Sequence, residues 1–273
     1  MKLLLLQLLA ACAVCCGCRF HSTTASPSDD GSSSRIIEAQ PQLASERGSS
    51  RWIVETFFSK QEFPESDRYY KREMGKYAGR PPMGAYMPAG FRLTVVLLEE
   101  SAEHAIYRAT YSHTSKPGDW YAYLDRSDGP WRLAAVRCLA LPAFLRDLFA
   151  QLRAKPNRTE EEESELQRME LLFSSDSELR AFLKDRVSQF DALAKLITNG
   201  AAKDSYAHLL KQVRISDGSV DSAGRVVLTI GGILDNSVGF MFVPSSSSPP
   251  KMTPEEFILV ESILGMWYLF KTT

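Results

Sequence analysis

Hydrophobic and polar residues follow different patterns in successive stretches of this chain, and each pattern predicts a different structure. An apolar N-terminal stretch over residues 1–18 gives way to a polar, serine-rich stretch with few large apolar side chains. Such a composition cannot bury enough surface to offset the entropy that is lost on ordering. We therefore expect a disordered tether over residues 19–50, with the folded body beginning at residue 51.

Residues 51–140 predict two short helices followed by four strands. The apolar spacing of residues 52–58 indicates an amphipathic helix, and residues 67–77 indicate a second, more charged one. A loop rich in glycine and proline follows. The strand candidates, which are separated by turn signals, are 91–98, 105–111, 120–125 and 131–139. Short connections of this kind favour an antiparallel meander.

Residues 141–273 switch to a helical period and then return to strands. Phe144, Leu148 and Leu152 lie on one face of a predicted helix, and Thr159 begins another. Further helices are predicted over residues 177–199 and 206–212, and strands over 213–215, 225–233, 237–243, 257–261 and 266–271. The predicted fold class is α+β: helices with a curved antiparallel sheet, a helical middle segment and a C-terminal antiparallel sheet. We expect two domains, 51–140 and 141–273.

The predicted hairpin of residues 120–125 and 131–133, with Gly129-Pro130 at its turn, resembles the closing hairpin of the cystatin-like or NTF2-like fold. Members of that group place helices before a strongly curved antiparallel sheet. The resemblance implies a cone-shaped pocket between helix and sheet. Some members use this pocket as an enzyme site, and many use it only for binding or assembly.

The N-terminal stretch has the layout of a secretory signal peptide. Lys2 precedes an apolar run that only Gln7 interrupts before Cys16. The run is too short to span a hydrocarbon core of about 30 Å. An ordinary secretory signal without a lipid and an uncleaved anchor are the alternatives.

This stretch also resembles the signals of bacterial lipoproteins, in which a cysteine after an aliphatic and two small residues is acylated. Leu9-Ala10-Ala11-Cys12 fits that box, although few residues precede it. Cys18 gives a signal of more usual length, but Cys15 stands where an aliphatic residue is expected. The resemblance implies a palmitate-bearing membrane anchor at Cys12 or Cys18, on the periplasmic or outer-surface side of the cell envelope.

The composition of the chain limits the kinds of partner that we expect it to bind. The formal net charge is −1, and the chain has no basic block, which argues against nucleic acid as the main partner. Beyond the signal the only cysteine is Cys138, so no internal disulfide can form there, and we interpret it as a small buried apolar residue.

No spacing of residues indicates a metal site or a cofactor site. The histidines are His21, His104, His113 and His208, and none belongs to a compact ligand motif. The sequence contains no nucleophile elbow, phosphate-binding loop or dinucleotide fingerprint. We therefore predict no cofactor, no metal and no catalytic residue.

Two groups of residues are candidates for binding. The aromatic set Trp120, Tyr121, Tyr123 and Trp131 lies on two predicted strands, where Trp120 should face away from Tyr121 and Tyr123. Such aromatic residues first indicate a core, but one face could line a ligand pocket. Asp235-Asn236-Ser237 first indicates a hairpin turn and second the tip of a binding loop.

These observations predict a lipid-anchored envelope protein with a non-enzymatic role, which binds a protein or a small ligand. One alternative is a hydrolase or isomerase that uses the NTF2-like pocket. A deep pocket lined by Asp125, His113 or Tyr107 would favour it. The other alternative is a periplasmic immunity or inhibitor protein.

Overall fold

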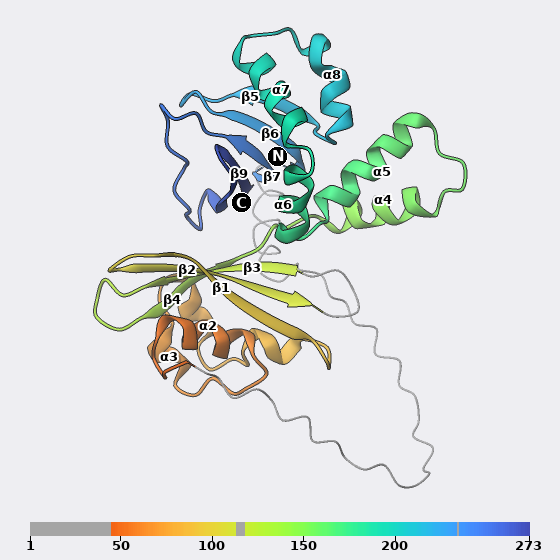
Figure 1. Cartoon of the computed structure of the whole chain (residues 1–273). Helices are drawn as coiled ribbons and strands as arrows, with labels where there is room; N and C mark the ends of the chain where they lie inside the picture. The colour runs from red at the N-terminus through yellow and green to blue at the C-terminus, as the bar shows by residue number, and fades with distance from the viewer. Residues whose placement is uncertain (1–44, 113–117, 234) are drawn as a thin grey trace, which may run out of the picture. The chain divides into compact units, whose positions relative to one another are not determined.

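The computed structural model describes residues 45–112, 118–233 and 235–273. These residues form helices and two antiparallel sheets, one of four strands and one of five (Figure 1). The predicted α+β class is therefore confirmed. The predicted signal and most of the predicted tether lie outside the described residues. No helix within the described ranges is long and apolar enough to cross a membrane.

The first helix, α2, spans Ser50–Phe58 and begins inside the stretch that we expected to be a tether. The side chain of Ser49 accepts a hydrogen bond from the backbone N–H of Trp52 at 3.2 Å. This serine caps the helix, because a side-chain oxygen satisfies a backbone donor that has no partner within the helix. The ordered body thus starts a few residues earlier than the serine-rich composition suggested.

The second predicted helix, over residues 67–77, is wrong as a single element. The structure instead has a short helix α3 (Ser66–Tyr69) and a 3₁₀-helix η1 (Arg72–Tyr77). Between them Tyr70 forms a bridge with Leu133, and the backbone N–H of Lys71 donates to the Leu133 carbonyl at 3.0 Å. A backbone drawn into an extended pairing cannot continue a helix. A second 3₁₀-helix, η2, spans Met83–Tyr86.

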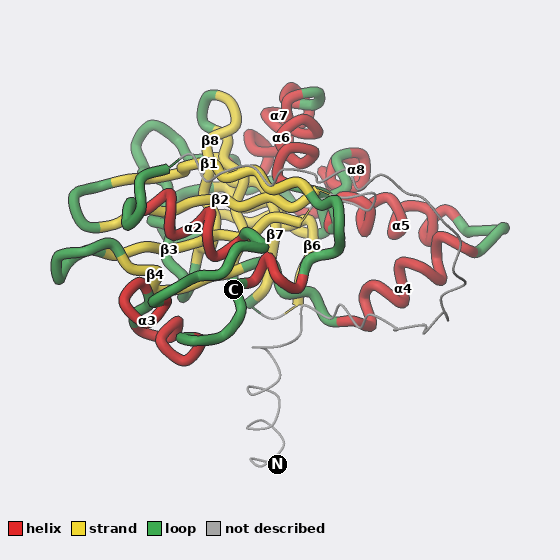
Figure 2. The backbone as a smooth tube through the Cα atoms, turned by 90° about the horizontal axis from the view of Figure 1, so that it is seen from below, coloured by secondary structure: helices red, strands yellow, loops and turns green. Residues whose placement is uncertain are grey.

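The four predicted strands of the first half are confirmed, and they pair as an antiparallel meander in the order β1-β2-β3-β4. Their bounds are β1 Arg92–Glu100, β2 His104–Ser112, β3 Gly118–Asp125 and β4 Arg132–Arg137. Helix α2 lies across one face of this sheet (Figure 2). On that face the Tyr111 hydroxyl donates to the Phe58 carbonyl at 2.9 Å.

Five helices follow. They are α4 (Ala143–Ala154), α5 (Glu160–Leu172), α6 (Asp176–Lys184), α7 (Val187–Thr198) and α8 (Lys203–Gln212). The single helix predicted over 177–199 is two helices, because the backbone of Arg186 leaves the helical region (φ −127°). Thr159 and Ser175 each begin a helix with a complete capping box.

The second sheet has the order β5-β6-β7-β9-β8, and every neighbouring pair is antiparallel. Its strands are β5 Asp217–Val220, β6 Val226–Ile233, β7 Asn236–Phe242, β8 Phe257–Leu264 and β9 Trp267–Thr272. The strand predicted over 213–215 is wrong. Val213 caps the end of α8 and Arg214 has a positive φ of 56°, so the strand begins only at Asp217.

One hydrophobic core crosses the boundary between the two predicted domains. Tyr121 and Tyr123 of the first sheet belong to the same buried cluster as Phe190, Phe240 and Trp267. The two sheets share no strand pairing, yet the face of the first sheet that turns away from α2 packs on the second half. Burial of this shared apolar surface couples the halves.

Candidate functional site

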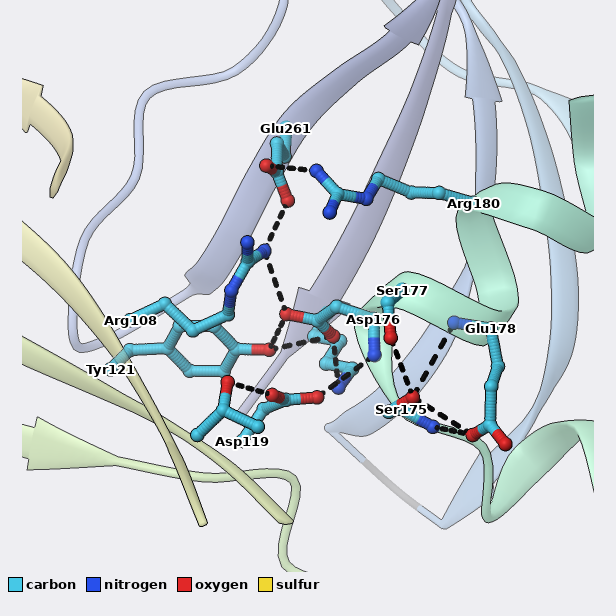
Figure 3. A network of polar contacts seen from close by, with 11 residues as sticks. Arg108, Asp119, Tyr121, Ser175, Asp176, Ser177, Glu178, Arg180 and Glu261 are labelled. Atoms are coloured by element: carbon cyan, nitrogen blue, oxygen red, sulfur yellow. Dashed lines mark hydrogen bonds and ion pairs between the residues drawn. The ribbon is translucent and has the colours of Figure 1, made fainter. Parts of the chain in front are cut away.

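A buried network of charged side chains lies where the two halves meet, and Asp176 is at its centre (Figure 3). Asp176 is the first residue of α6 and only 1% exposed. Its carboxylate accepts a hydrogen bond from the Tyr121 hydroxyl at 2.9 Å and one from Arg108 Nη1 at 3.3 Å. Lys271 Nζ lies 2.6 Å from the same carboxylate. One side chain of the second half is thus held by two from the first sheet and one from β9.

The local sequence explains how these groups meet. Arg108 in β2 is directly opposite Tyr121 in β3, so both side chains project from the same face of the first sheet. Asp176 follows Ser175, which caps α6, and a carboxylate in the first turn of a helix is favoured by the helix dipole. Arg108 and Tyr121 of the sheet therefore donate hydrogen bonds, and Asp176 at the start of α6 accepts them.

A second layer of contacts surrounds this centre. Arg108 Nη1 also donates to Glu261 Oε2 at 2.6 Å, and Arg180 binds the other oxygen of Glu261 at 2.5 Å. Asp119 accepts from the backbone N–H of Asp176 at 2.8 Å. The network therefore pairs two carboxylates, Asp176 and Glu261, with three cationic side chains, Arg108, Arg180 and Lys271. Asp119 instead accepts hydrogen bonds from the Asp176 backbone and the Thr110 hydroxyl.

The electrostatics favour the protonated forms of Tyr121 and Arg108. Burial raises the pKa of the Tyr121 phenol well above its ordinary value, and the Asp176 carboxylate raises it further. The phenol therefore stays protonated and donates its hydrogen to Asp176. Burial alone would lower the pKa of Arg108, but the carboxylates of Glu261 and Asp176 outweigh burial and raise this pKa overall.

The network is closed, because its charged groups bind one another. Within the part of the chain that the structure describes, the buried side-chain atoms without a hydrogen-bond partner are Arg132 Nε and Asn236 Oδ1, and neither belongs to the network. A general acid or base needs a proton that a substrate can reach. This arrangement instead suits a structural connection between the two halves.

Aromatic rings pack around α2, both on the first sheet and on the segment that follows the helix. Phe58 packs edge-on against Tyr111 at a centroid distance of 5.7 Å, and Phe57 against Tyr70 at 6.1 Å. Trp52 packs against Phe63 in the same way at 5.6 Å. Burial raises the pKa of both Tyr70 and Tyr111. This is the region in which the NTF2-like resemblance implied a pocket.

The structure brings together only part of the aromatic set predicted to line a ligand pocket. Tyr121 and Tyr123 lie side by side in the shared core, and the Tyr123 hydroxyl donates to the Ile258 carbonyl at 2.9 Å. Trp120 is opposite Ala109 and is half-buried. Trp131 packs under the guanidinium of Arg126, whose carbon lies 4.7 Å from the ring centroid.

The residues that would have favoured an enzyme lie in separate interactions. Asp125 is buried and forms ion pairs with Lys71 at 3.0 Å and Arg72 at 3.3 Å. Tyr107 shares a hydrogen bond with Ser50 at 2.9 Å on the α2 face. His113 lies outside the described residues, as do the predicted lipidation sites Cys12 and Cys18.

A shallow, open depression lies beside α7. Its lining residues are Asp191, Ala194, Lys195, Thr198, Asn199, Phe242 and Met266. Asp191 is already engaged, because it accepts a hydrogen bond from Trp267 Nε1 at 2.8 Å. Across residues 45–112, 118–233 and 235–273, no group of His, Cys, Asp and Glu is arranged to hold a metal ion.

Sequence reasoning missed the charged network. Its signal was weak but present: Arg108 interrupts an apolar strand, and Lys271 ends a strand rich in aromatic residues. Charged residues inside buried strands are almost never found unpaired. That rule could have marked both residues, but it could not have named Asp176 as their common partner.

The known proteins offer no guide to the role of this arrangement. Comparisons with models of protein families, with curated proteins and with solved structures find no match for the chain.

Proposed function

We propose that this chain is a lipid-anchored protein of the bacterial cell envelope whose role is to bind a partner rather than to catalyse a reaction. The pattern of residues 1–18 carries the proposal: one lysine, an apolar run and cysteines that follow small residues. Such a segment is read as a lipoprotein signal, and acyl chains on a cysteine would hold the protein at the membrane.

The length of chain before the body fits this role. The described body begins at Ser45, which leaves residues 19–44 to connect it to the membrane if Cys18 is acylated. If the predicted tether holds, a serine-rich chain of this length would reach about 25–30 Å on average. The body would therefore work close to the bilayer, where its partner would be an envelope protein or a small ligand.

The interior of the body supports binding over catalysis. Aromatic rings of α2 pack against Tyr111 of the first sheet and against Tyr70, and the charged centre at Asp176 is satisfied by its own neighbours. We propose that the first half is related to the NTF2-like group by its helix-then-meander order and uses that scaffold for assembly. The enzymatic alternative would require a solvent-accessible acid–base pair, whereas Asp125 and Tyr107 are each engaged elsewhere.

Membrane fractionation tests the location, and crosslinking in intact cells tests the role. The full chain should sediment with membranes and resist extraction by high salt, and Cys12→Ser/Cys18→Ser should release it. Crosslinking should capture a membrane-proximal partner for the parent and much less of it for the double variant. A parent chain that is soluble in the periplasm or medium would contradict the anchor.

A further inference from the structure

Strand β1 is an open sheet edge with an unusual composition. It is nine residues long, and its neighbour in the described sheet is β2 alone. None of its residues is fully buried, although five are large aliphatics: Leu93, Val95, Val96, Leu97 and Leu98. Long apolar edge strands are rare in isolated proteins, because their free N–H and C=O groups pair readily with another strand.

The exposed apolar groups of β1 lie on both faces of the sheet. Val96 is 38% exposed and Leu97 is 43% exposed. Val96 is opposite Arg108, which faces the second half, and Leu97 is opposite Tyr107, which faces α2. A partner lying on one face would cover only one of them. A strand added to the edge would contact both.

The charges of β1 are self-complementary. Arg92 stands at one end of the strand, and Glu99 and Glu100 stand at the other. All three are exposed, and no ion pair among the described residues involves any of them. Opposite charges across an antiparallel pair are favourable, and like charges are unfavourable.

We propose that β1 pairs with β1 of a second copy of this chain, antiparallel and about a two-fold axis at Val96. In this register Arg92 of one copy faces Glu100 of the other, and Val95 faces Leu97. The pairing joins two four-stranded sheets into one continuous sheet. It is an isologous contact, in which each residue of one copy repeats the contact of the other.

A bulge in β1 is compatible with this register. The pairing to β2 shifts between Leu97 and Glu99, and a bulge increases the local twist of a strand. If the bulge displaces the pairing by one residue, Glu99 of one copy lies opposite Thr94 of the other, diagonal to Arg92 on the same face and within reach of its long side chain. The central pairs from Thr94 to Leu98 supply the apolar contact.

Cysteine crosslinking tests the register directly. At the two-fold axis Val96 faces itself, and the Cα atoms of such a pair lie about 5 Å apart, within disulfide range. In the full chain, purified in detergent, Val96→Cys should give an oxidised dimer. Thr94→Cys is the matched control, because it lies on the same strand face and is also exposed, yet its two copies would be about 13 Å apart. Both variants and the parent keep the native cysteines. The evidence for the contact is therefore a dimer band that Val96→Cys shows in addition to any dimer band of the parent.

Charge reversal tests the same contact without cysteines. Arg92→Glu should raise the dissociation constant of the dimer about tenfold in sedimentation velocity, because two attractive pairs become repulsive. Arg92→Glu/Glu99→Arg/Glu100→Arg should restore it. A monomeric parent, equal crosslinking of Val96→Cys and Thr94→Cys, or a dimer unaffected by Arg92→Glu would each overturn the proposal. A monomer would also be the result if residues before Ser45 occupied the edge.

Discussion

The Tyr121 hydroxyl lies 2.9 Å from Oδ2 of Asp176, a residue 55 positions later in the chain. This hydrogen bond joins the first sheet to the start of α6. Tyr121 is fully buried, and Asp176 is 1% exposed. The bond is therefore made away from water, where a missing partner is costly. The loss of stability when this bond is removed therefore measures how strongly the two halves are connected.

Removing the hydroxyl should destabilise the body. We expect Tyr121→Phe to lower the free energy of unfolding by about 1.5–3 kcal/mol, because a hydrogen bond to a buried charge is lost. Tyr107→Phe is the control, since it loses a bond to the neutral Ser50 hydroxyl and should cost about 1 kcal/mol. Urea unfolding followed by circular dichroism measures both. A smaller effect for Tyr121→Phe than for Tyr107→Phe would contradict the central place of the network.

Breaking the ion pair between Asp176 and Lys271 should cost more. We expect Asp176→Asn to lower the free energy of unfolding by about 3–5 kcal/mol, because Lys271 would be left buried without a full counter-charge. Asp176→Asn/Lys271→Met should recover part of that loss. A double-mutant cycle by urea unfolding gives the coupling energy. Additive effects of the two substitutions would show that the pair does not act as a unit.

The ion pairs of Asp125 should make the free energy of unfolding depend on pH. Burial alone would raise the pKa of Asp125, but hydrogen bonds from Ser127 and Lys71 outweigh burial and hold this pKa well below its ordinary value. The carboxylate therefore contributes stability above the ordinary carboxyl pKa of about 3.9, and this contribution is lost as the pH falls below it. We expect Asp125→Asn to cost roughly 2 kcal/mol at pH 7 and much less near pH 2. Urea unfolding at several pH values measures this, and a cost independent of pH would refute it.

Gly84 should tolerate no side chain. A Cβ there would overlap the backbone carbonyl oxygens of Phe58 and Ser59, at the end of α2. We expect Gly84→Ala to cost about 1–3 kcal/mol, because backbone atoms cannot move aside cheaply. Gly75→Ala is the matched control, since Gly75 also lies in a 3₁₀-helix, has a negative φ and has open space around it. Equal melting temperatures for the two variants would contradict the close approach of η2 to α2.

Most of the helices and strands could be predicted from local patterns, because residues close together in the sequence determine them. The meander from β1 to β4 followed from alternation and turn residues, and α5 from the cap at Thr159. The failures have different causes. The helix predicted over 67–77 is broken because Tyr70 pairs with Leu133, which is distant in the sequence. The strand predicted at 213–215 is absent because the backbone N–H groups of these residues bind carbonyls of the last turn of α8.

The candidate site was harder to predict from the sequence than the helices and strands. Tyr121 and Tyr123 were singled out as aromatic residues on one strand face, and the structure places both in the shared core. Their hydroxyl partners, Asp176 and the Ile258 carbonyl, come from distant parts of the chain. No periodicity indicates such a pairing, because it arises only when segments distant in the sequence pack together.

Metabolic labelling with palmitate tests the central claim most directly. The full chain would be expressed in a bacterial host as the parent, as Cys12→Ser and as Cys18→Ser, and the label on the purified protein would be measured. We predict that the parent is labelled and that one of the two variants loses the label, which identifies the anchored cysteine. An unlabelled parent would contradict the lipid anchor, and the body would then have to be studied as a freely secreted binding protein.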